Sequence, residues 1–158
     1  MRRAAALAVL VVALAAGCGG GSSAPREGVG VFMTRILREE INGQWAKQWS
    51  ELHPGHQQLI SRAQYVTCSR AMRTNIATGK EAFHVLDVHD EPIDVKGVPQ
   101  KTSKLVTISF RVPGTAPLTY RLHAVAVDGR WTWILGDAFL TQLGHGRCLD
   151  GSPLSKQT

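Results

Sequence analysis

The chain has 158 residues, of which 44% are hydrophobic, and a formal net charge of +6. This length is typical of one domain with a single hydrophobic core. The positive charge is spread along the chain, and no cluster of Lys and Arg is interleaved with aromatic residues, which argues against a nucleic-acid partner. The sequence also lacks a phosphate-binding glycine loop, a nucleophile elbow and a Cys-x-x-Cys pair.

The N-terminus has the features of an export signal. Arg2 and Arg3 supply positive charge, and Ala4–Ala16 form an apolar stretch of 13 residues. A helix needs roughly 20 apolar residues to cross a hydrocarbon core of about 30 Å. The stretch is therefore predicted to be the apolar region of a signal peptide.

The apolar stretch ends at a cysteine placed like the modified residue of bacterial lipoproteins. Cys18 follows a glycine and precedes a run of glycine and serine. In this pattern the signal peptide, residues 1–17, is removed and the cysteine becomes the lipidated first residue. The cleavage box is imperfect, because Ala15 stands where leucine is more common and Leu14 is displaced by one. The alternatives are an ordinary secretory signal cut near Ala16 and an uncleaved anchor.

Lipidation would place the protein on the extracytoplasmic face of the cell membrane. Several acyl chains on one cysteine are enough for stable anchoring. Residues 18–27 are rich in Gly and Ser, which is the composition of a flexible tether. Removal of the signal leaves a net charge of +4, and we expect this excess to reflect solvation beside an anionic membrane surface.

The first element expected after the tether is one long amphipathic helix. Apolar residues recur every four positions from Val29 to Trp49, with Leu52 beside this stripe, and charged residues lie largely on other faces. Asn42 and Gly43 interrupt this stripe, and they are predicted to kink the helix or to split it in two. The His-Pro-Gly sequence at 53–55 is predicted to end it, since proline disfavours helical geometry in the residue before it.

A second, shorter helix is predicted over residues 56–65. Its apolar residues are Leu59, Ile60 and Ala63. The segment 66–72 is expected to continue as a further turn or helix that carries a cysteine.

The second half of the chain has the signature of β-strands. Residues 82–88 are rich in strand formers, and apolar and polar residues alternate over 106–112, as in a half-buried strand. Two more strands are expected over 118–127 and 130–135. The order, helices first and then an antiparallel meander, indicates an α+β fold.

The last two strands are predicted to form a hairpin. Asp128 and Gly129 separate them, and this dipeptide strongly favours a two-residue type I′ turn. Such a turn fixes the pairing of the strands: Val127 with Arg130, Ala126 with Trp131, and Ala124 with Trp133. Small residues then stand opposite large ones, as in a well-packed cross-strand face.

Several of these features together resemble a known superfamily. They are the long N-terminal helix, the stretch Trp49-x-x-Leu52-His53-Pro54, a second helix ending near Tyr65 and Cys68, and a closing strand with Asp128-Gly129-Arg130-Trp131. In these respects the chain is similar to nuclear transport factor 2-like domains, also called SnoaL-like or cystatin-related cone domains. More narrowly, it is similar to uncharacterised actinobacterial lipoproteins of this kind. The resemblance covers residues 28–148 and leaves 149–158 as a C-terminal tail.

The resemblance implies that N-terminal helices pack on a curved antiparallel sheet around a conical cavity. Members of the superfamily include small isomerases, dehydratases and many non-catalytic ligand or protein binders, so the fold leaves the function open. We expect a non-catalytic domain that binds an unknown small ligand or protein partner. The alternative is a small cavity enzyme of the isomerase or dehydratase type. Related domains often dimerise through the open sheet face, which makes a homodimer an expectation as well.

Aromatic and titratable side chains are the candidates for the lining of that cavity: Trp45, Trp49, Tyr65, His84, Tyr120, Trp131 and Trp133. The spacing of the tryptophans along the helix and the hairpin favours packing in the core over a ligand pocket. Catalytic relatives use Asp, His or Tyr for acid–base chemistry, and the other such groups here are Asp87, His89, Asp94 and His123. None of them matches a catalytic motif, so no catalytic residue is assigned. The acidic run before Pro92 is expected to be a solvated strand end.

A His-x-x-His pair raises the question of a metal. His53 and His56 flank Pro54-Gly55, which makes this segment a turn, whereas metal-binding pairs usually lie on a regular helix or strand. No third ligand has a recognisable spacing. We therefore expect neither a metal nor another cofactor.

The two remaining cysteines are predicted to form a disulfide. Once Cys18 is lipidated, Cys68 and Cys148 are an even pair in an exported protein. Their bond would tie the segment after the final strand to the helical half. The alternatives are two buried thiols that never meet and a reactive redox pair. If Cys148 were unpaired, it could join His145 as a metal ligand.

Overall fold

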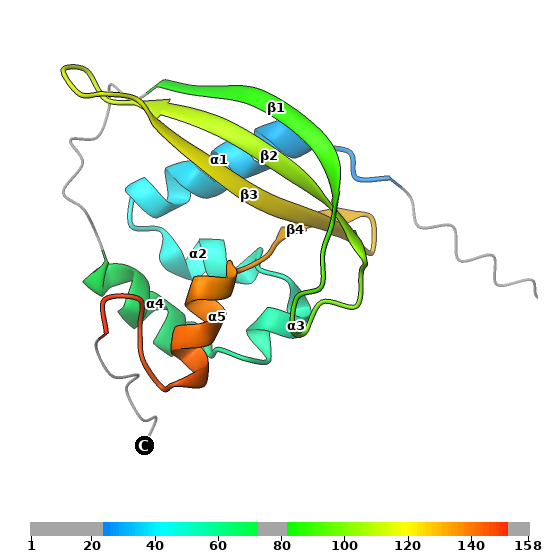
Figure 1. Cartoon of the computed structure of the whole chain (residues 1–158), viewed down its shortest axis with the longest axis vertical. Coiled ribbons are helices and arrows are strands. Elements are labelled where there is room, and N and C mark those ends of the chain that lie inside the picture. The colour runs from blue at the N-terminus through cyan, green and yellow to red at the C-terminus, as the bar shows by residue number, and fades with distance from the viewer. Residues whose placement is uncertain (1–23, 73–81, 152–158) are drawn as a thin grey trace, which may run out of the picture.

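Helices cover one face of an antiparallel sheet, which confirms the predicted α+β class (Figure 1). The computed structural model describes residues 24–72 and 82–151. In chain order the elements are α1 (Val29–Ile41), α2 (Trp45–Ser50), α3 (Pro54–Gln57), α4 (Arg62–Ala71), β1 (Ala82–Pro92), β2 (Thr102–Arg111), β3 (Leu118–Val127), β4 (Arg130–Trp133) and α5 (Asp137–Gly144). The predicted signal peptide and the lipidation site Cys18 lie outside the described residues.

The sheet is an open meander of four strands in the order β1-β2-β3-β4. Strand β1 bends over α1, and its register with β2 shifts at a bulge between Val85 and Asp87 (Figure 1). Helix α1 contacts all four strands. At the other edge, β4 forms a single parallel bridge between Trp133 and Leu52, so the connection from α2 to α3 continues the sheet for one residue.

The β3–β4 hairpin has the predicted register. The pairs are Val127 with Arg130, Ala126 with Trp131, and Ala124 with Trp133. Asp128 and Gly129 have φ values of 50° and 71°, so both central residues are left-handed, as a type I′ turn requires. The sequence signal was strong because few dipeptides tolerate this geometry.

The long N-terminal helix is split rather than kinked. Helix α1 ends at Ile41 and α2 begins at Trp45, and Gly43 between them has a φ of 68°. A residue in the left-handed region terminates a helix, and glycine takes up that geometry without a side-chain clash. The interrupted stripe therefore folds as two helices.

The predicted second helix over 56–65 is wrong in its boundaries. Pro54 does not end a helix but begins the four-residue α3, where its fixed φ suits the first helical position. Helix α4 begins after Ser61, whose side chain forms a capping box with Gln64, and it continues through Cys68. The Ser-x-x-Gln spacing is the signal that identifies this start.

Helix α5 was not predicted. It lies between β4 and Cys148, after the predicted strand 130–135, where no element was expected. Glycines stand just before it and at its last position, and no side chain caps its start. Phe139 nevertheless reaches the core, with Leu140 and Leu143 packed beside it.

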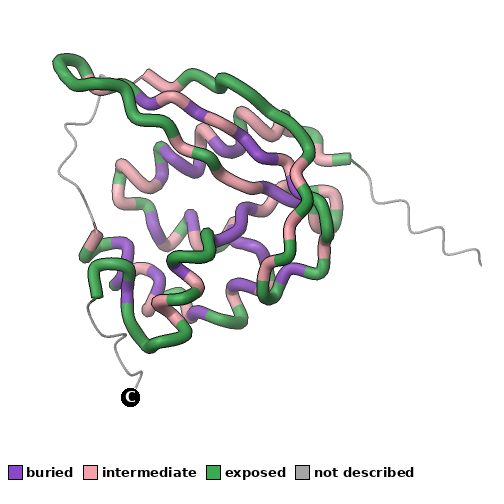
Figure 2. Tube along the Cα trace, viewed as in Figure 1, coloured by how far each residue is buried: buried purple, intermediate pink, exposed green. Residues whose placement is uncertain are grey.

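The main core fills the space between the sheet and the helices (Figure 2). Its buried members are Phe32, Met33, Ile36, Leu37, Trp45, Leu52, Ile60, Tyr65, Cys68, Val106, Ile108, Ala124, Trp133, Leu135, Phe139 and Cys148. A smaller cluster of Val98, Val125 and Ile134 lies on the other face of the sheet. The segment 93–101 covers this second cluster with Ile93 and Val95.

The predicted disulfide between Cys68 and Cys148 is present. Their Cα atoms lie 5.2 Å apart, and both residues are buried. The bond joins α4 to the segment after α5, so it ties the end of the described chain to the helical half as expected.

Candidate functional site

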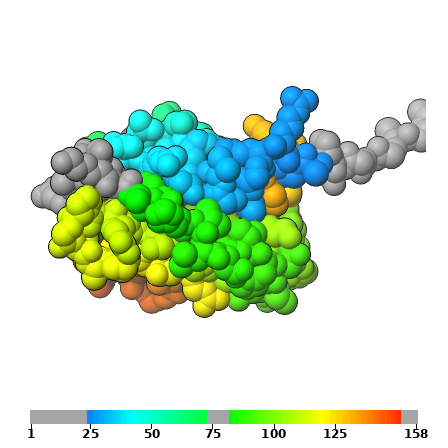
Figure 3. Space-filling model, turned by 90° about the horizontal axis from the view of Figure 1, so that it is seen from above, coloured from blue at the N-terminus to red at the C-terminus, as the bar shows by residue number. Residues whose placement is uncertain are grey.

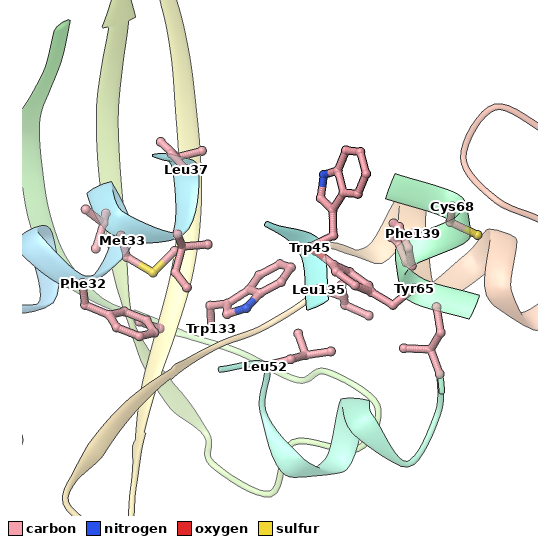
Figure 4. Close-up of a cluster of buried hydrophobic side chains, with 14 of the residues drawn as sticks. Phe32, Met33, Leu37, Trp45, Leu52, Tyr65, Cys68, Trp133, Leu135 and Phe139 are labelled. Atoms are coloured by element: carbon pink, nitrogen blue, oxygen red, sulfur yellow. The ribbon is translucent and has the colours of Figure 1, made fainter. Parts of the chain in front are cut away.

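Three of the candidate cavity residues lie in the packed core. Trp45, Tyr65 and Trp133 come from α2, α4 and β4, and each is at least nine-tenths buried. Figure 4 shows them meeting Leu52 and Leu135 between the sheet and the helices. The Tyr65 and Trp133 rings pack edge to face with centroids 6.0 Å apart. Side chains thus occupy the space in which a conical cavity was expected.

The other four candidates lie at the margin or outside. Trp49, Tyr120 and Trp131 are half-buried and pack against the core, whereas His84 is exposed on β1. Trp49 lines a surface hollow of about 620 Å³ together with residues around Gly43 and Arg62. Only Trp131 lines the groove described below.

A glutamine that the sequence did not single out is the polar centre of the interior. Gln48 accepts a hydrogen bond from the Tyr65 hydroxyl. Its side-chain nitrogen donates to the main-chain oxygen of Ile36 at 3.3 Å. The main-chain oxygen of Gln48 accepts a hydrogen bond from the Trp133 indole nitrogen at 3.0 Å. Gln48 therefore joins α1, α2, α4 and β4. In the sequence, a polar residue next to a hydrophobic stripe does not indicate that its side chain will join several elements.

A partly buried carboxyl lies beside this centre. Burial raises the pKa of Glu40 above its usual range, although the side chains of Gln48 and Trp45 act to lower it. Burial also raises the pKa values of Tyr65 and Tyr120, and the Glu40 charge adds to both shifts. The indole nitrogen of Trp45 is buried without a partner in hydrogen-bond geometry. A carboxyl of this kind is the chemical group that a proton-transfer reaction would use.

The two histidines of the His-x-x-His pair form hydrogen bonds within the domain. The Nδ1 atom of His56 accepts from the Leu135 N–H at 2.9 Å, and its Nε2 lies 3.0 Å from the carbonyl oxygen of Lys96. His53 accepts from the Gly55 N–H at 3.0 Å, and its Nε2 lies 3.2 Å from the Gln100 side chain. Each ring nitrogen of the two histidines has a partner, so the pair joins the start of α3 to the segment just after β4 and to the segment 93–101. Burial lowers the pKa of both residues.

The acidic run before Pro92 lies in the second half of strand β1, which ends at Pro92. Asp87 and Asp90 are exposed on the strand, and their side chains contact His89 and Lys104. Within the ranges 24–72 and 82–151, no group of three or more His, Cys, Asp or Glu side chains is placed to hold a metal ion.

A serine, a histidine and a glutamate meet across the outer face of the sheet. The Oγ atom of Ser103 lies 2.8 Å from Nδ1 of His123, and the Nε2 of His123 lies 3.5 Å from the Glu91 carboxylate. The residue types are those of a hydrolytic triad. Ser103 is only 2% exposed, however, so a substrate cannot reach its hydroxyl. The polar groups of the three residues instead serve as partners for one another at the end of the sheet.

A second hollow lies where the chain enters the domain. It has a volume of about 570 Å³. Four segments that are distant in the sequence form its walls, namely residues 24–27, the first half of α1, residues 50–57 and the tip of the β3–β4 hairpin. In Figure 3 the first described residues, in blue, lie against the orange hairpin. We call this hollow the entry groove.

The entry groove is held together by hydrogen bonds to one residue of the incoming chain. The indole of Trp131 donates to the main-chain oxygen of Glu27 at 2.8 Å. The Glu27 carboxylate in turn pairs with Arg35 of α1 at 3.0 Å. Arg35 also contacts the Glu51 carboxylate, and its guanidinium lies 5.3 Å from the centre of the Phe32 ring. Burial acts to lower the pKa of Arg35, but the bonds to Glu27 and Glu51 hold it above its usual value.

The groove has two further basic side chains. Arg26 of the incoming chain and Arg130 of the hairpin both line the groove and are exposed. Neither has an ion-pair partner among the residues that the structure describes. Arg35 is neutralised by its carboxylates, so these two arginines give the groove its free positive charge.

None of the described helices has both the length and the hydropathy needed to cross a bilayer. Comparisons with protein-family models, with curated proteins and with solved structures found no match to this chain.

Proposed function

We propose that the protein is a lipid-anchored, extracytoplasmic binding protein whose non-catalytic domain takes up its ligand or partner in the entry groove. The observation that carries the proposal is the position of the groove at the point where the chain enters the domain. A hollow of about 570 Å³ with aromatic, polar and charged walls has the size and composition of a small-molecule site.

The packing of the interior supports a binding protein over a cavity enzyme. An enzyme of the isomerase or dehydratase type needs acid–base groups that converge on a space open to substrate. Here Trp45, Tyr65 and Trp133 fill the space between sheet and helices. The Ser103 hydroxyl is likewise covered.

Membership of the nuclear transport factor 2-like superfamily is part of the proposal. It is supported by the order of the elements, with helices before an antiparallel meander, and by the bend of β1 over α1 (Figure 1). The four strands do not close, so in this proposal the domain is a member whose cone is filled by side chains.

The lipid anchor is tested by the Cys18→Ala substitution in the full-length chain. We expect the variant to leave the membrane fraction or to accumulate as an unprocessed precursor, because no acylated residue remains. The wild-type protein should carry the added mass of acyl chains on its first residue. Unchanged processing and retention of the variant would refute the anchor.

The groove is tested by native mass spectrometry of the protein purified from the membrane fraction. We expect a bound molecule on the wild-type protein and on the Trp49→Phe variant, because Trp49 does not line the groove. The Trp131→Ala variant should lose it. Retention of the molecule by Trp131→Ala would place the site elsewhere.

The alternative, a small acid–base enzyme, is favoured by one observation, the raised pKa of Glu40 beside two tyrosines. If this carboxyl transferred protons, Glu40→Gln would abolish the conversion of a molecule that the wild-type protein still binds. A ligand recovered chemically unchanged from both proteins after prolonged incubation would exclude this alternative.

A further inference from the structure

We infer that the entry groove binds the anionic head group of a phospholipid in the membrane that anchors the chain. This inference deepens the proposed function and rests on it for the location of the groove. It follows from the charge of the groove, the chemistry of its walls and the length of chain between the groove and Cys18.

The charge of the groove fits a phosphate. Of the charged residues in its lining, Arg35 is already paired with Glu27 and Glu51. Arg26 and Arg130 remain without such a partner in the described part of the chain. Both line the groove, on the two segments that the Trp131–Glu27 bond joins, so an anion in the groove would meet these two cations. Arginine presents its donors in a planar fork that suits a phosphate group.

The walls also provide apolar surface beside the charge. Trp131 lies next to Arg130 on the hairpin, and Phe32 and Leu52 are part of the groove lining. A tryptophan with an apolar ring and a hydrogen-bonded nitrogen is typical of side chains at the boundary between water and lipid. A phospholipid presents the same combination, because its phosphate is joined to a glycerol backbone and acyl chains.

The length of chain before the groove places it near the membrane. Ala24 is in the groove wall, six positions after the proposed lipid attachment at Cys18. A chain spans at most about 3.6 Å per residue, so this segment reaches no more than about 22 Å. Lipidation at Cys18 would therefore keep the groove with Arg26 and Arg130 within about 22 Å of the bilayer surface.

The main chain beside both arginines is held in place before a ligand arrives. The type I′ turn fixes the main chain before Arg130, and the bonds of Glu27 to Trp131 and Arg35 fix the main chain next to Arg26. Binding by groups that are already positioned loses less conformational entropy than binding by free side chains. The bonds of Glu27 to Trp131 and Arg35 are not required for a general attraction between charges.

The test uses the mature chain, residues 18–158, with Cys18→Ser so that no acyl chain holds it on a membrane. It is sedimented with vesicles of phosphatidylglycerol and phosphatidylcholine, and with vesicles of phosphatidylcholine alone. We expect partition only onto the anionic vesicles, and weaker partition as salt is raised. Each basic side chain near an anionic surface contributes about fivefold, so the double variant Arg26→Gln, Arg130→Gln should partition about thirtyfold less.

The matched control is the double variant Arg70→Gln, Arg111→Gln. It removes the same charge from exposed positions on α4 and at the end of β2, outside the groove lining. We expect its partition onto the anionic vesicles to change by less than twofold. Equal losses in both double variants would show attraction by net charge alone and would overturn the inference.

Titration with glycerol 1-phosphate and with inorganic phosphate distinguishes a membrane ligand from a soluble one. Binding of either as tight as partition onto vesicles would identify a soluble phosphate ligand and overturn the assignment to the membrane, as would no preference for anionic vesicles. The proposed function fails separately. It fails if Cys18→Ala stays in the membrane fraction or if Trp131→Ala keeps its bound molecule, whatever the vesicles show.

Discussion

The indole nitrogen of Trp131 donates a 2.8 Å hydrogen bond to the main-chain oxygen of Glu27, across 104 positions of the sequence. This bond fastens the incoming chain to the hairpin and closes one side of the entry groove. It means that the chain is fastened to the domain at Glu27, before α1 begins. In the proposed function, the residues before Glu27 would set the distance between the domain and the membrane.

Substitution of this tryptophan tests that role. Trp131→Phe keeps the aromatic ring but removes the donor, and we expect a loss of about 1 kcal/mol in the free energy of unfolding. Amide hydrogens near the start of α1 should exchange faster, because the incoming chain is no longer fastened. Trp49→Phe is the matched control, since it removes a similar bond of 3.1 Å to the carbonyl of Ile60. Equal exchange in the two variants would contradict the role of Trp131.

Gly55 lies close against the main chain of Gly97. A β-carbon on Gly55 would lie 1.6 Å from the carbonyl oxygen of Gly97. Gly55→Ala must therefore push α3 away from the segment 93–101, and we expect it to cost about 3 kcal/mol. Gly144→Ala in α5 is the control, because nothing lies within 4 Å of its added carbon. Urea denaturation measures the free energy of unfolding of both variants. Equal values would contradict the close approach of Gly55 to Gly97.

The disulfide is expected to supply a large part of the stability. It closes a loop with a sequence separation of 80, for which the chain-entropy model gives about 4.5 kcal/mol. The double variant Cys68→Ala, Cys148→Ala should therefore unfold at a much lower urea concentration than the oxidised protein. Peptide mapping without reductant should recover the two cysteines in one linked fragment. Two free thiols in the native protein would show that the bond does not form.

Stability is expected to fall as the protein is acidified. Burial lowers the pKa of His53, His56 and His123 below the ordinary value of 6.5. The unfolded chain then binds more protons than the folded protein over the interval between the lowered pKa and 6.5. The contribution of these histidines to the free energy of unfolding is complete above about pH 6.5. It is lost as the pH falls below this value. Urea titrations at pH 7.5, 6.0 and 5.0 measure the change.

Two variants separate the groups responsible. His56→Gln cannot take up a proton, so it should be less stable at pH 7.5 but lose less stability on acidification. Glu40 acts in the opposite direction, because its raised pKa makes the folded protein bind a proton more readily. Glu40→Gln should therefore steepen the loss. A free energy of unfolding that is constant from pH 7.5 to 5.0 would contradict the burial of the neutral histidines.

The parts of the fold that could be predicted from the sequence are those whose signals are local. Asp128 and Gly129 admit few backbone geometries, and the turn they form fixes the hairpin register. The period of the helix stripe likewise located α1 and α2. The Ser61–Gln64 capping box was an equally local signal for α4, and Pro54 marked a helix start that was interpreted as an end.

The parts that could not be predicted depend on contacts between distant segments. Helix α5 is short and lacks a side-chain cap, so its position depends on the packing of Phe139 against the core. Gln48 gains its role only from the meeting of three helices and a strand. The entry groove is formed by four separate segments, and of its lining only Trp131 was among the candidate residues. No local pattern could indicate that Arg26 and Arg130 line the same groove.

The indole N–H signals of the four tryptophans test most directly whether the groove or the interior is the binding site. Trp131 lines the groove, whereas Trp45 and Trp133 lie in the core and Trp49 lies at another hollow. ¹H–¹⁵N NMR spectra of the mature Cys18→Ser chain are recorded with bicelles of phosphatidylglycerol and phosphatidylcholine. We predict that the Trp131 signal shifts while those of Trp45 and Trp133 stay in place. Shifts of Trp45 and Trp133 with an unchanged Trp131 would contradict a groove site.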